Sequence, residues 1–256
     1  MKRKIATLLA LCLFVMSAGT TYGVTPPPQA EAPDDETAAL TPSQRIVFLT
    51  IDDGPGGHTH AILDVLDEFG VPATFFFLGQ NYRANAGVMR RAIATGHGVH
   101  HHSWSHTVAQ FYNRGPGGFM EEIDRTNDML RGLVFARSRL IRVPFGSHPW
   151  FSPAATGYRS GLRNALNDNG FRFWDWNIDS NDWRYDANQV EAVAQNIIGP
   201  LRNHNWSRPA NVLIHEYGWT PQLLRRVLPV ILDELDAEMR VITNTCTPQN
   251  FQNDIN

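Results

Sequence analysis

The sequence predicts an α/β protein with a largely parallel sheet, and three observations support this prediction. Short apolar runs alternate with segments of helical spacing along most of the 256 residues, which is the pattern of βα units in series. The run at residues 46–49 contains no polar residue, as expected for a strand covered on both faces. The composition is 43% hydrophobic with a formal net charge of −3, which fits one or two globular domains and excludes a disordered or collagen-like chain.

The N-terminal segment differs from the alternating part. Basic residues at positions 2–4 precede an apolar run from Ile5 to Met16, and small and polar residues follow through Gly23. This order predicts a secretory signal peptide over residues 1–23, because the run is too short for a comfortable transmembrane span. An uncleaved membrane anchor is the alternative.

A tether and one domain are expected after the signal peptide. Residues 24–44 are rich in Pro, Ala and acidic residues without periodicity, which predicts a flexible linker. Residues 45–256 then form the folded domain, with a secreted or periplasmic location and no membrane contact after cleavage. Cys246 is the only cysteine that cleavage leaves, so the domain is expected to depend on its core and not on an internal disulfide.

The first elements of this domain follow from their patterns. Residues 46–49 form a continuous apolar run and predict a buried strand. Apolar positions at helical spacing then predict a helix that Thr59 caps and Gly70 terminates. The next elements expected are a strand at 74–78, a helix at 85–95 and a strand at 98–101.

The later elements repeat this alternation. Helices are expected at about 118–133, 154–169, 188–198 and 221–237, and strands at 139–143, 171–178, 211–214 and 240–243. This makes about seven βα units in series, which gives a parallel sheet with helices outside. An open doubly wound sheet and a closed or partly closed barrel both remain possible, and in either one the chemistry belongs at the carboxyl ends of the strands.

Polar residues follow almost every predicted strand. They are Asp52 and Asp53 after the first, His102 to His106 after the third, Arg142 after the fourth, Asp179 to Asp182 after the fifth and His215 after the sixth. Residues far apart in the sequence are therefore expected to meet at one rim of the sheet.

The histidines in this set indicate a metal site. His102 and His106 are four residues apart, which on a helical turn would place both imidazoles on one face. Imidazole is a common ligand of zinc and its neighbours, and an aspartate from another strand end would complete a set of two histidines and one carboxylate. Such a set leaves metal positions open for water and substrate.

Five segments together resemble the ordered motifs of the polysaccharide deacetylases, the NodB-homology or carbohydrate esterase family 4 group. They are Thr50 to Pro55, His102 to His106, Arg142 to Phe145, Asp179 to Trp183 and Leu213 to His215. The resemblance extends from Arg45 to Thr243 and implies a distorted (β/α) barrel. It also implies an enzyme that removes acetyl groups from polymers of N-acetylglucosamine such as peptidoglycan or chitin, or from xylan.

The resemblance assigns roles to the neighbouring aspartates and to the residues that serve them. Asp53 would bind a divalent cation, most simply zinc with cobalt or nickel as alternatives, together with His102 and His106. Asp52 would remain off the metal as the general base, held ionised by Arg142. Neutralisation by the cation and the arginine would make two adjacent carboxylates tolerable.

The remaining roles concern the leaving group and the acetyl pocket. His215 would be the general acid and Asp182 would hold its ring. The backbone N–H of Phe145 would complete an oxyanion site, although the family usually has tyrosine at this position, so any role of a phenol hydroxyl is lost. Trp183 and Leu213 would line a pocket for the acetyl methyl group. Asp179 would either bind Arg142 or shape the turn.

Other functions fit the sequence less well. The slightly acidic balance and the absence of a long basic run give no indication of nucleic-acid binding. No G-x-S-x-G or H-E-x-x-H motif occurs, which argues against a serine hydrolase and a zincin-type protease. An inactive carbohydrate-binding module and a metal buffer remain as alternatives. Neither explains the combined presence of base, ligands and acid. An acetylated polysaccharide is the expected partner, and a monomer is the expected state.

Overall fold

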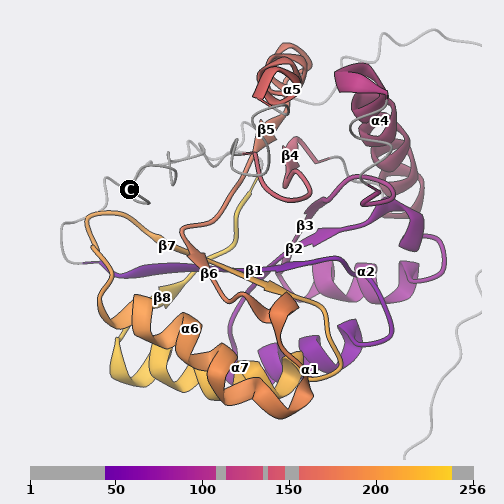
Figure 1. The fold of residues 1–256 in the computed structure, drawn as a ribbon. Helices are drawn as coiled ribbons and strands as arrows, with labels where there is room; N and C mark the ends of the chain where they lie inside the picture. The colour runs from indigo at the N-terminus through magenta and orange to yellow at the C-terminus, as the bar shows by residue number, and fades with distance from the viewer. Residues whose placement is uncertain (1–43, 108–113, 135–137, 148–155, 244–256) are drawn as a thin grey trace, which may run out of the picture. The chain divides into compact units, whose positions relative to one another are not determined.

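The computed structural model describes residues 44–107, 114–134, 138–147 and 156–243 (Figure 1). These residues belong to one unit that extends from Leu40 to Asn256. The expected signal peptide and all but the last residue of the expected linker lie outside the described residues. No helix of the described residues is long and apolar enough to cross a membrane.

A parallel sheet forms the centre of the domain. Within the described residues the strands are β1 (Ile46–Asp52), β2 (Thr74–Phe77), β3 (Gly98–His101), β4 (Leu140–Ile141), β5 (Arg172–Phe173), β6 (Ile178–Asp179), β7 (Ala210–His215) and β8 (Glu238–Met239). Their order is β5-β4-β3-β2-β1-β7-β6, with β8 paired to the start of β1. The sheet curls and is a distorted (β/α) barrel, which confirms the predicted fold class.

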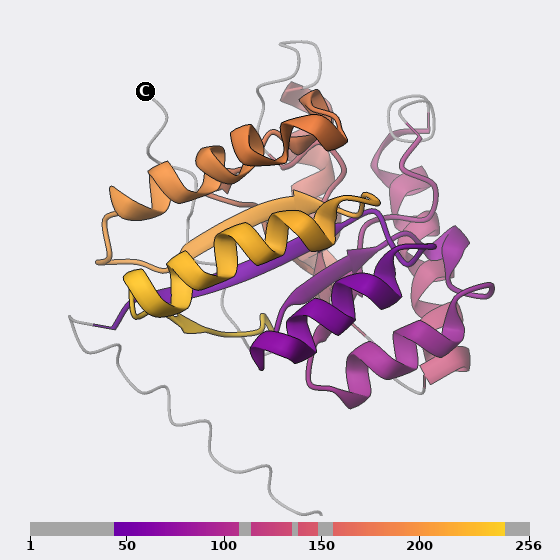
Figure 2. The same cartoon turned by 90° about the horizontal axis from the view of Figure 1, so that it is seen from below.

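The helices cover the outside of this sheet. They are α1 (Thr59–Phe69), α2 (Ala86–Ala94), α4 (Gly115–Val134), α5 (Thr156–Asp168), α6 (Val190–Arg202) and α7 (Thr220–Pro229). Their contacts follow the order of the strands, with α6 on α7, α7 on α1, α1 on α2, α2 on α4 and α4 on α5. In Figure 2, α7 crosses in front of β1 and β7, and α1 lies beside it.

The period of two along β1 separates two apolar layers. Val47, Leu49 and Ile51 point outward into the large cluster shared with the helices. Ile46 and Phe48 point inward, where they pack in a smaller cluster with residues including Phe76 and Trp174. The same inward row continues with Thr50 and Asp52 toward the carboxyl end, so the interior changes from apolar to polar along the strand.

The expected single strand at 171–178 is wrong, because the chain changes partner within it. Trp174 N donates to Ile141 O on the β4 side at 2.8 Å, whereas Asn177 N donates to Asn211 O on the β7 side at 3.1 Å. The four residues from 174 to 177 therefore link the two ends of the curled sheet, and the strand divides into β5 and β6. Periodicity did not show this, because apolar side chains continue across the change of partner, as at Phe173, Trp176 and Ile178.

Three smaller expectations are also wrong. The strand expected at 240–243 lies earlier, at β8, and Ile242 instead bonds to Thr74 Oγ1 through its N–H. The last helix is α-helical only to Pro229 and continues as a π-helical turn, Val230–Glu234. Thr59 is the first residue of α1 and His58 occupies the cap position.

Candidate metal-centred active site

The parallel register brings the polar strand ends together. Asp52 is the register partner of His215 on β7 and of Phe76 on β2. Beyond the strands, Asp53 N donates to Phe76 O at 3.2 Å, and His102 N donates to Phe77 O at 3.0 Å. The expectation that these residues share one rim therefore agrees with the backbone hydrogen bonds.

Asp53, His102 and His106 form a group that could hold a metal ion. Asp53 Oδ1 lies 3.6 Å from His102 Nε2 and 3.8 Å from His106 Nε2, and one ligand atom of each residue lies within 4.8 Å of the others. Zinc–ligand distances of about 2.0–2.2 Å in a tetrahedral site place neighbouring ligand atoms roughly 3.4 Å apart. Asp53 Oδ1 is also buried without a hydrogen-bond partner, and a bound cation would satisfy it.

The Nδ1 atom of His102 fixes the ring so that Nε2 can bind a metal. Nδ1 lies 2.8 Å from Arg142 O, so it carries the proton and leaves the Nε2 lone pair directed toward Asp53 and His106. Burial lowers the pKa of His102 to about 3, with the Asp53 charge opposing and the His106 charge adding to this effect. The ring is therefore neutral at ordinary pH, as a metal ligand must be.

The loop that carries both histidines is not the expected helical turn. Ser103 and His106 have φ values of 70° and 55°, which a helix does not allow. His106 N instead donates to Ser103 Oγ at 3.1 Å. The two imidazoles still approach each other, with ring centroids 5.0 Å apart.

Left-handed backbone is concentrated at this rim. Of the six non-glycine residues with positive φ in the described residues, Asp53, Ser103, His106, Phe145 and Asn181 all lie in the strand-end loops that carry the predicted site. Such conformations cost of order 1–3 kcal/mol each and persist only when surrounding contacts enforce them.

Asp52 forms a buried ion pair with Arg142. Arg142 Nη1 donates to Asp52 Oδ1 at 2.8 Å and to Thr50 Oγ1 at 2.7 Å, while Nε and Nη2 donate to the carbonyl oxygens of Trp174 and Asp175. Burial raises the pKa of Asp52, and the charges of Arg142 and His215 oppose that rise. The second oxygen of Asp52 lies 3.5 Å from His102 Nε2, so the carboxylate faces the metal group while Arg142 holds its other side.

Asp182 holds His215 at two points. Its Oδ1 lies 2.6 Å from His215 Nδ1, and its Oδ2 accepts from the His215 backbone N–H at 2.6 Å. Burial opposes protonation of the ring, but the hydrogen bond and charge of Asp182, together with the charges of Asp52 and Asp53, raise the pKa of His215 to about 9. His215 is therefore a cation at neutral pH, with Nε2 as the ring nitrogen that Asp182 does not bind.

The residues expected to contact substrate differ in exposure. Phe145 is 36% exposed and its ring packs against His106 at 4.8 Å, whereas Leu213 is 3% exposed. Trp183 is 56% exposed and lies under the guanidinium of Arg184. Asp179 accepts from Asn181 N and from Trp176 Nε1. Of the two roles expected for it, binding Arg142 or shaping the turn, these contacts agree with the second.

Residues that sequence reasoning missed support the predicted ones. Glu216 accepts from Thr59 Oγ1 at 2.6 Å and from His58 N at 3.1 Å, and thereby caps α1, whose own cap residue makes no side-chain hydrogen bond. A Cβ at Gly54 or Gly56 would overlap the Glu216 carboxylate, which explains the glycines of this loop. Glu122 on α4 makes similar contacts to the loop of His102 and His106. The partners are far apart in sequence, so no local signal marked either carboxylate.

The chain is similar to several known proteins. A family model described as polysaccharide deacetylase matches residues 39–174. A peptidoglycan-N-acetylglucosamine deacetylase of Bacillus cereus is 32% identical over 212 residues, which cover 80% of this chain and 73% of that protein. The crystal structure of a polysaccharide deacetylase from Bacillus cereus is 30% identical with a TM-score of 0.70 and covers 82% of this chain and 98% of its own. The catalytic domain of a peptidoglycan N-acetylglucosamine deacetylase from Eubacterium rectale is 26% identical with a TM-score of 0.71, covering 82% and 94%. The chain belongs to the polysaccharide deacetylase family, the NodB-homology group of carbohydrate esterase family 4 hydrolases.

Proposed function

We propose that this protein is a secreted, metal-dependent hydrolase that removes N-acetyl groups from polysaccharides containing N-acetylglucosamine. The observation that carries the proposal is the meeting of three groups at one rim. These are the Asp53, His102 and His106 cluster, the Asp52–Arg142 pair and the His215–Asp182 pair. An amide hydrolase needs a polarised carbonyl, a base for water and an acid for the leaving amine, and the three groups supply these functions.

The cation would be held by Asp53, His102 and His106. When bound, a divalent ion such as zinc supplies a Lewis acid that polarises a carbonyl and lowers the pKa of a coordinated water. The three residues leave room for further ligands, as catalytic sites do. Zinc is the ion that we propose, and cobalt and nickel also accept this donor set.

Asp52 would take the proton from the attacking water. Its carboxylate faces His102 and is held by Arg142 on the other side, so it has one fixed direction in which to accept a proton. The arginine favours the charged form against the burial that disfavours it. Arg142 therefore acts by orienting the base and keeping it ionised.

His215 would donate the proton that the leaving amine needs. Asp182 holds His215 by one hydrogen bond to the ring and one from the backbone N–H, and it keeps the ring protonated at neutral pH. As the C–N bond breaks, Nε2–H would protonate the nitrogen, and the sugar would leave as an amine while acetate remains. The Phe145 N–H would hold the carbonyl oxygen, and Trp183 and Leu213 would contact the acetyl methyl group.

The substrate class comes from the relatives. The Bacillus cereus relative is named for peptidoglycan N-acetylglucosamine, so we propose peptidoglycan or chitin-type oligomers. Acetyl-xylan, which carries O-acetyl groups, is the second candidate because the same groups can hydrolyse an ester. Action outside the cytoplasm fits the expected signal peptide and linker, and we propose a monomer.

Acetate release from peptidoglycan, chitin oligomers and acetyl-xylan, measured side by side, tests this proposal. We expect release from the first two, loss of release on chelation and recovery with zinc or cobalt. Undiminished turnover by metal-free protein would contradict the mechanism. Release from acetyl-xylan alone would be compatible with the proposed mechanism but would contradict the proposed substrate.

A further inference from the structure

We infer that Glu122 is a positioning residue that keeps the loop of His102 and His106 in its metal-binding conformation. The inference rests on the proposed metal site. It concerns a buried carboxylate on α4 that lies outside the five sequence motifs.

Glu122 makes its contacts inside the loop. It is 7% exposed, and its Oε2 accepts from Trp104 N at 3.2 Å while Oε1 accepts from Ser105 Oγ at 2.9 Å. Trp104 and Ser105 lie between the two histidines, so the carboxylate binds the segment whose shape sets the separation of His102 from His106.

The conformation that Glu122 supports needs outside contacts. Ser103 and His106 are both left-handed without being glycine, and such residues are held in place only by their surroundings. Other groups bind carbonyl oxygens of the same loop, where Gly79 N donates to Ser103 O at 3.0 Å and Gln80 N donates to Trp104 O at 3.1 Å. The loop is therefore bonded both from the Gly79–Asn81 turn and from α4, and Glu122 is the acceptor for the Trp104 N–H.

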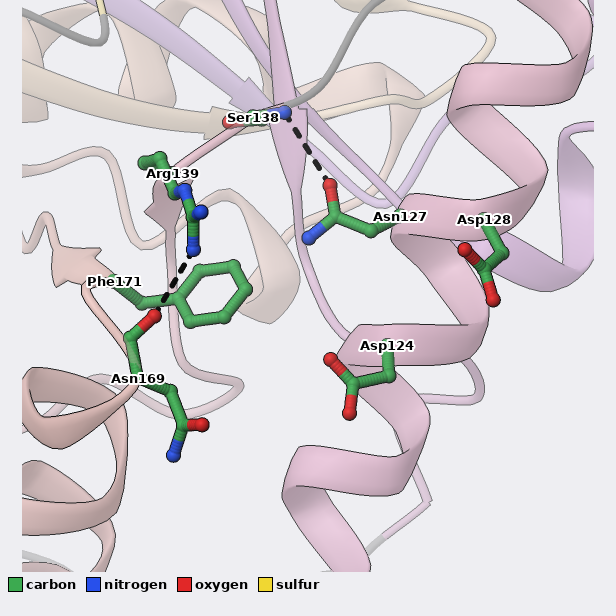
Figure 3. A pocket seen from close by; sticks show the side chains of 7 residues that line it. All are labelled: Asp124, Asn127, Asp128, Ser138, Arg139, Asn169 and Phe171. Carbon is green, nitrogen blue, oxygen red and sulfur yellow. Dashed lines mark hydrogen bonds between the residues drawn. The ribbon is translucent and has the colours of Figure 1, made fainter.

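The rest of α4 shows that this helix supports the histidine segment. Arg125 lies over the Trp104 ring at 3.6 Å, and Asn127 Oδ1 lies 2.7 Å from His101 Nε2, one residue before His102. Asn127 lines a pocket of about 350 Å³ between α4 and the residues just before β4 and β5. Figure 3 shows it accepting a hydrogen bond from Ser138 N there. None of the predicted site residues lines that pocket. The helix α4 therefore contacts the histidine segment through Asn127 at His101 and through Glu122 at the loop.

Three variants test the inference, with the zinc affinity of the purified protein as the readout. Glu122→Ala removes both acceptors, and we expect the affinity for zinc to fall about 10-fold to 100-fold, the range for groups that orient ligands. Glu122→Gln keeps one oxygen for Trp104 N and can donate to Ser105 Oγ after the hydroxyl turns, so its affinity should remain within about threefold of the parent. Glu121→Ala is the matched control, because this neighbouring carboxylate on α4 is exposed and pairs with Arg114. It should bind zinc as the parent does.

Thermal unfolding of the metal-free proteins separates positioning from general damage to the fold. Zinc binding is measured well below each unfolding temperature, so a lower affinity in a folded variant reflects the site. Should Glu122→Ala not fold, Ser105→Ala removes one of the two hydrogen bonds from the loop side and is expected to weaken zinc binding several-fold.

The outcomes are distinct. A parent that binds no zinc would refute the proposed function itself. A parent that binds zinc together with a Glu122→Ala variant of equal affinity, or a Glu122→Gln variant as weak as Glu122→Ala, would overturn the positioning role. If Ser105→Ala is the variant used, parental affinity in it would overturn the role as well.

Discussion

Asp52 on β1 and His215 on β7 are register partners in the parallel sheet, so their side chains leave the same face of neighbouring strands. Neighbouring parallel strands lie about 4.8 Å apart, so the proposed base and the proposed acid are carried by adjacent strands at that spacing. Glu216 N also donates to Asp52 O at 3.0 Å immediately after His215. The separation of the two groups is therefore set by backbone hydrogen bonds and not by flexible loops.

The first prediction concerns His215. As a general acid it should contribute about 10² to 10⁴ in rate, so His215→Ala should lower kcat by that factor and keep its metal, because His215 lies outside the group of candidate ligands. Single-turnover kinetics and metal analysis of the same sample check both points. Loss of metal in this variant would make His215 a ligand and the assignment of roles wrong.

The second prediction is a pH dependence that comes from Asp182. The pKa of His215 is raised to about 9 from an ordinary value of 6.5. The ring is therefore protonated, and can act as an acid, below about pH 9, and activity should fall as the pH rises through that value. Protonation of His215 also stabilises the folded protein, because its pKa is higher in the folded state than in the unfolded state. This stabilisation is fully present below pH 6.5 and is lost as the pH rises to about 9.

Asp182→Asn should shift this alkaline limb. Burial alone lowers the pKa of His215, and the variant removes the hydrogen bond and charge that oppose burial most strongly. The limb should move to lower pH, so that activity at pH 8 falls more than activity at pH 6. A pH–rate profile from pH 5 to 10 measures the shift, and an unchanged limb would show that another group controls it.

The third prediction treats the Asp52–Arg142 pair as a unit of stability. Both side chains are at most 2% exposed, and removing one partner of a buried ion pair typically costs about 3–5 kcal/mol because the other charge is left alone. Arg142→Met, which keeps most of the volume, should lower the free energy of unfolding of the metal-free protein by that amount. The double variant with Asp52→Asn should recover part of the loss. Additive losses in the double-mutant cycle would mean that the pair does not act as a unit.

The sequence predicted what depends on period and order. The alternation of apolar runs and helical spacing located most of the strands and helices, and the positions after strands located Asp52, Asp53, His102, Arg142 and His215 at one rim. Parallel strands necessarily bring their carboxyl ends to one edge, so the positions of these residues after strands are enough to predict that they meet.

What the sequence could not predict depends on contacts between distant residues. Between residues 174 and 177 the chain changes its hydrogen-bond partner from β4 to β7. This change depends on which backbone groups meet when the sheet curls. Ser103 and His106 have left-handed backbone in a loop that is bonded to distant residues such as Glu122, so a spacing of four residues does not indicate a helical turn here. The identity of the barrel itself came from the family resemblance and not from periodicity.

The neighbouring aspartates give the most direct test of the central claim, because the account gives them different tasks. Asp53→Asn removes a proposed ligand, so the affinity for zinc should fall by about 10-fold to 100-fold or more. Asp52→Asn should bind zinc about as well as the parent and yet be nearly inactive, because the proton acceptor for water is lost. Metal content and acetate release are measured on both purified variants. We predict metal loss in Asp53→Asn alone and inactivity in both variants. Equal metal loss in both variants would show one shared site and would contradict the separation of base from ligand.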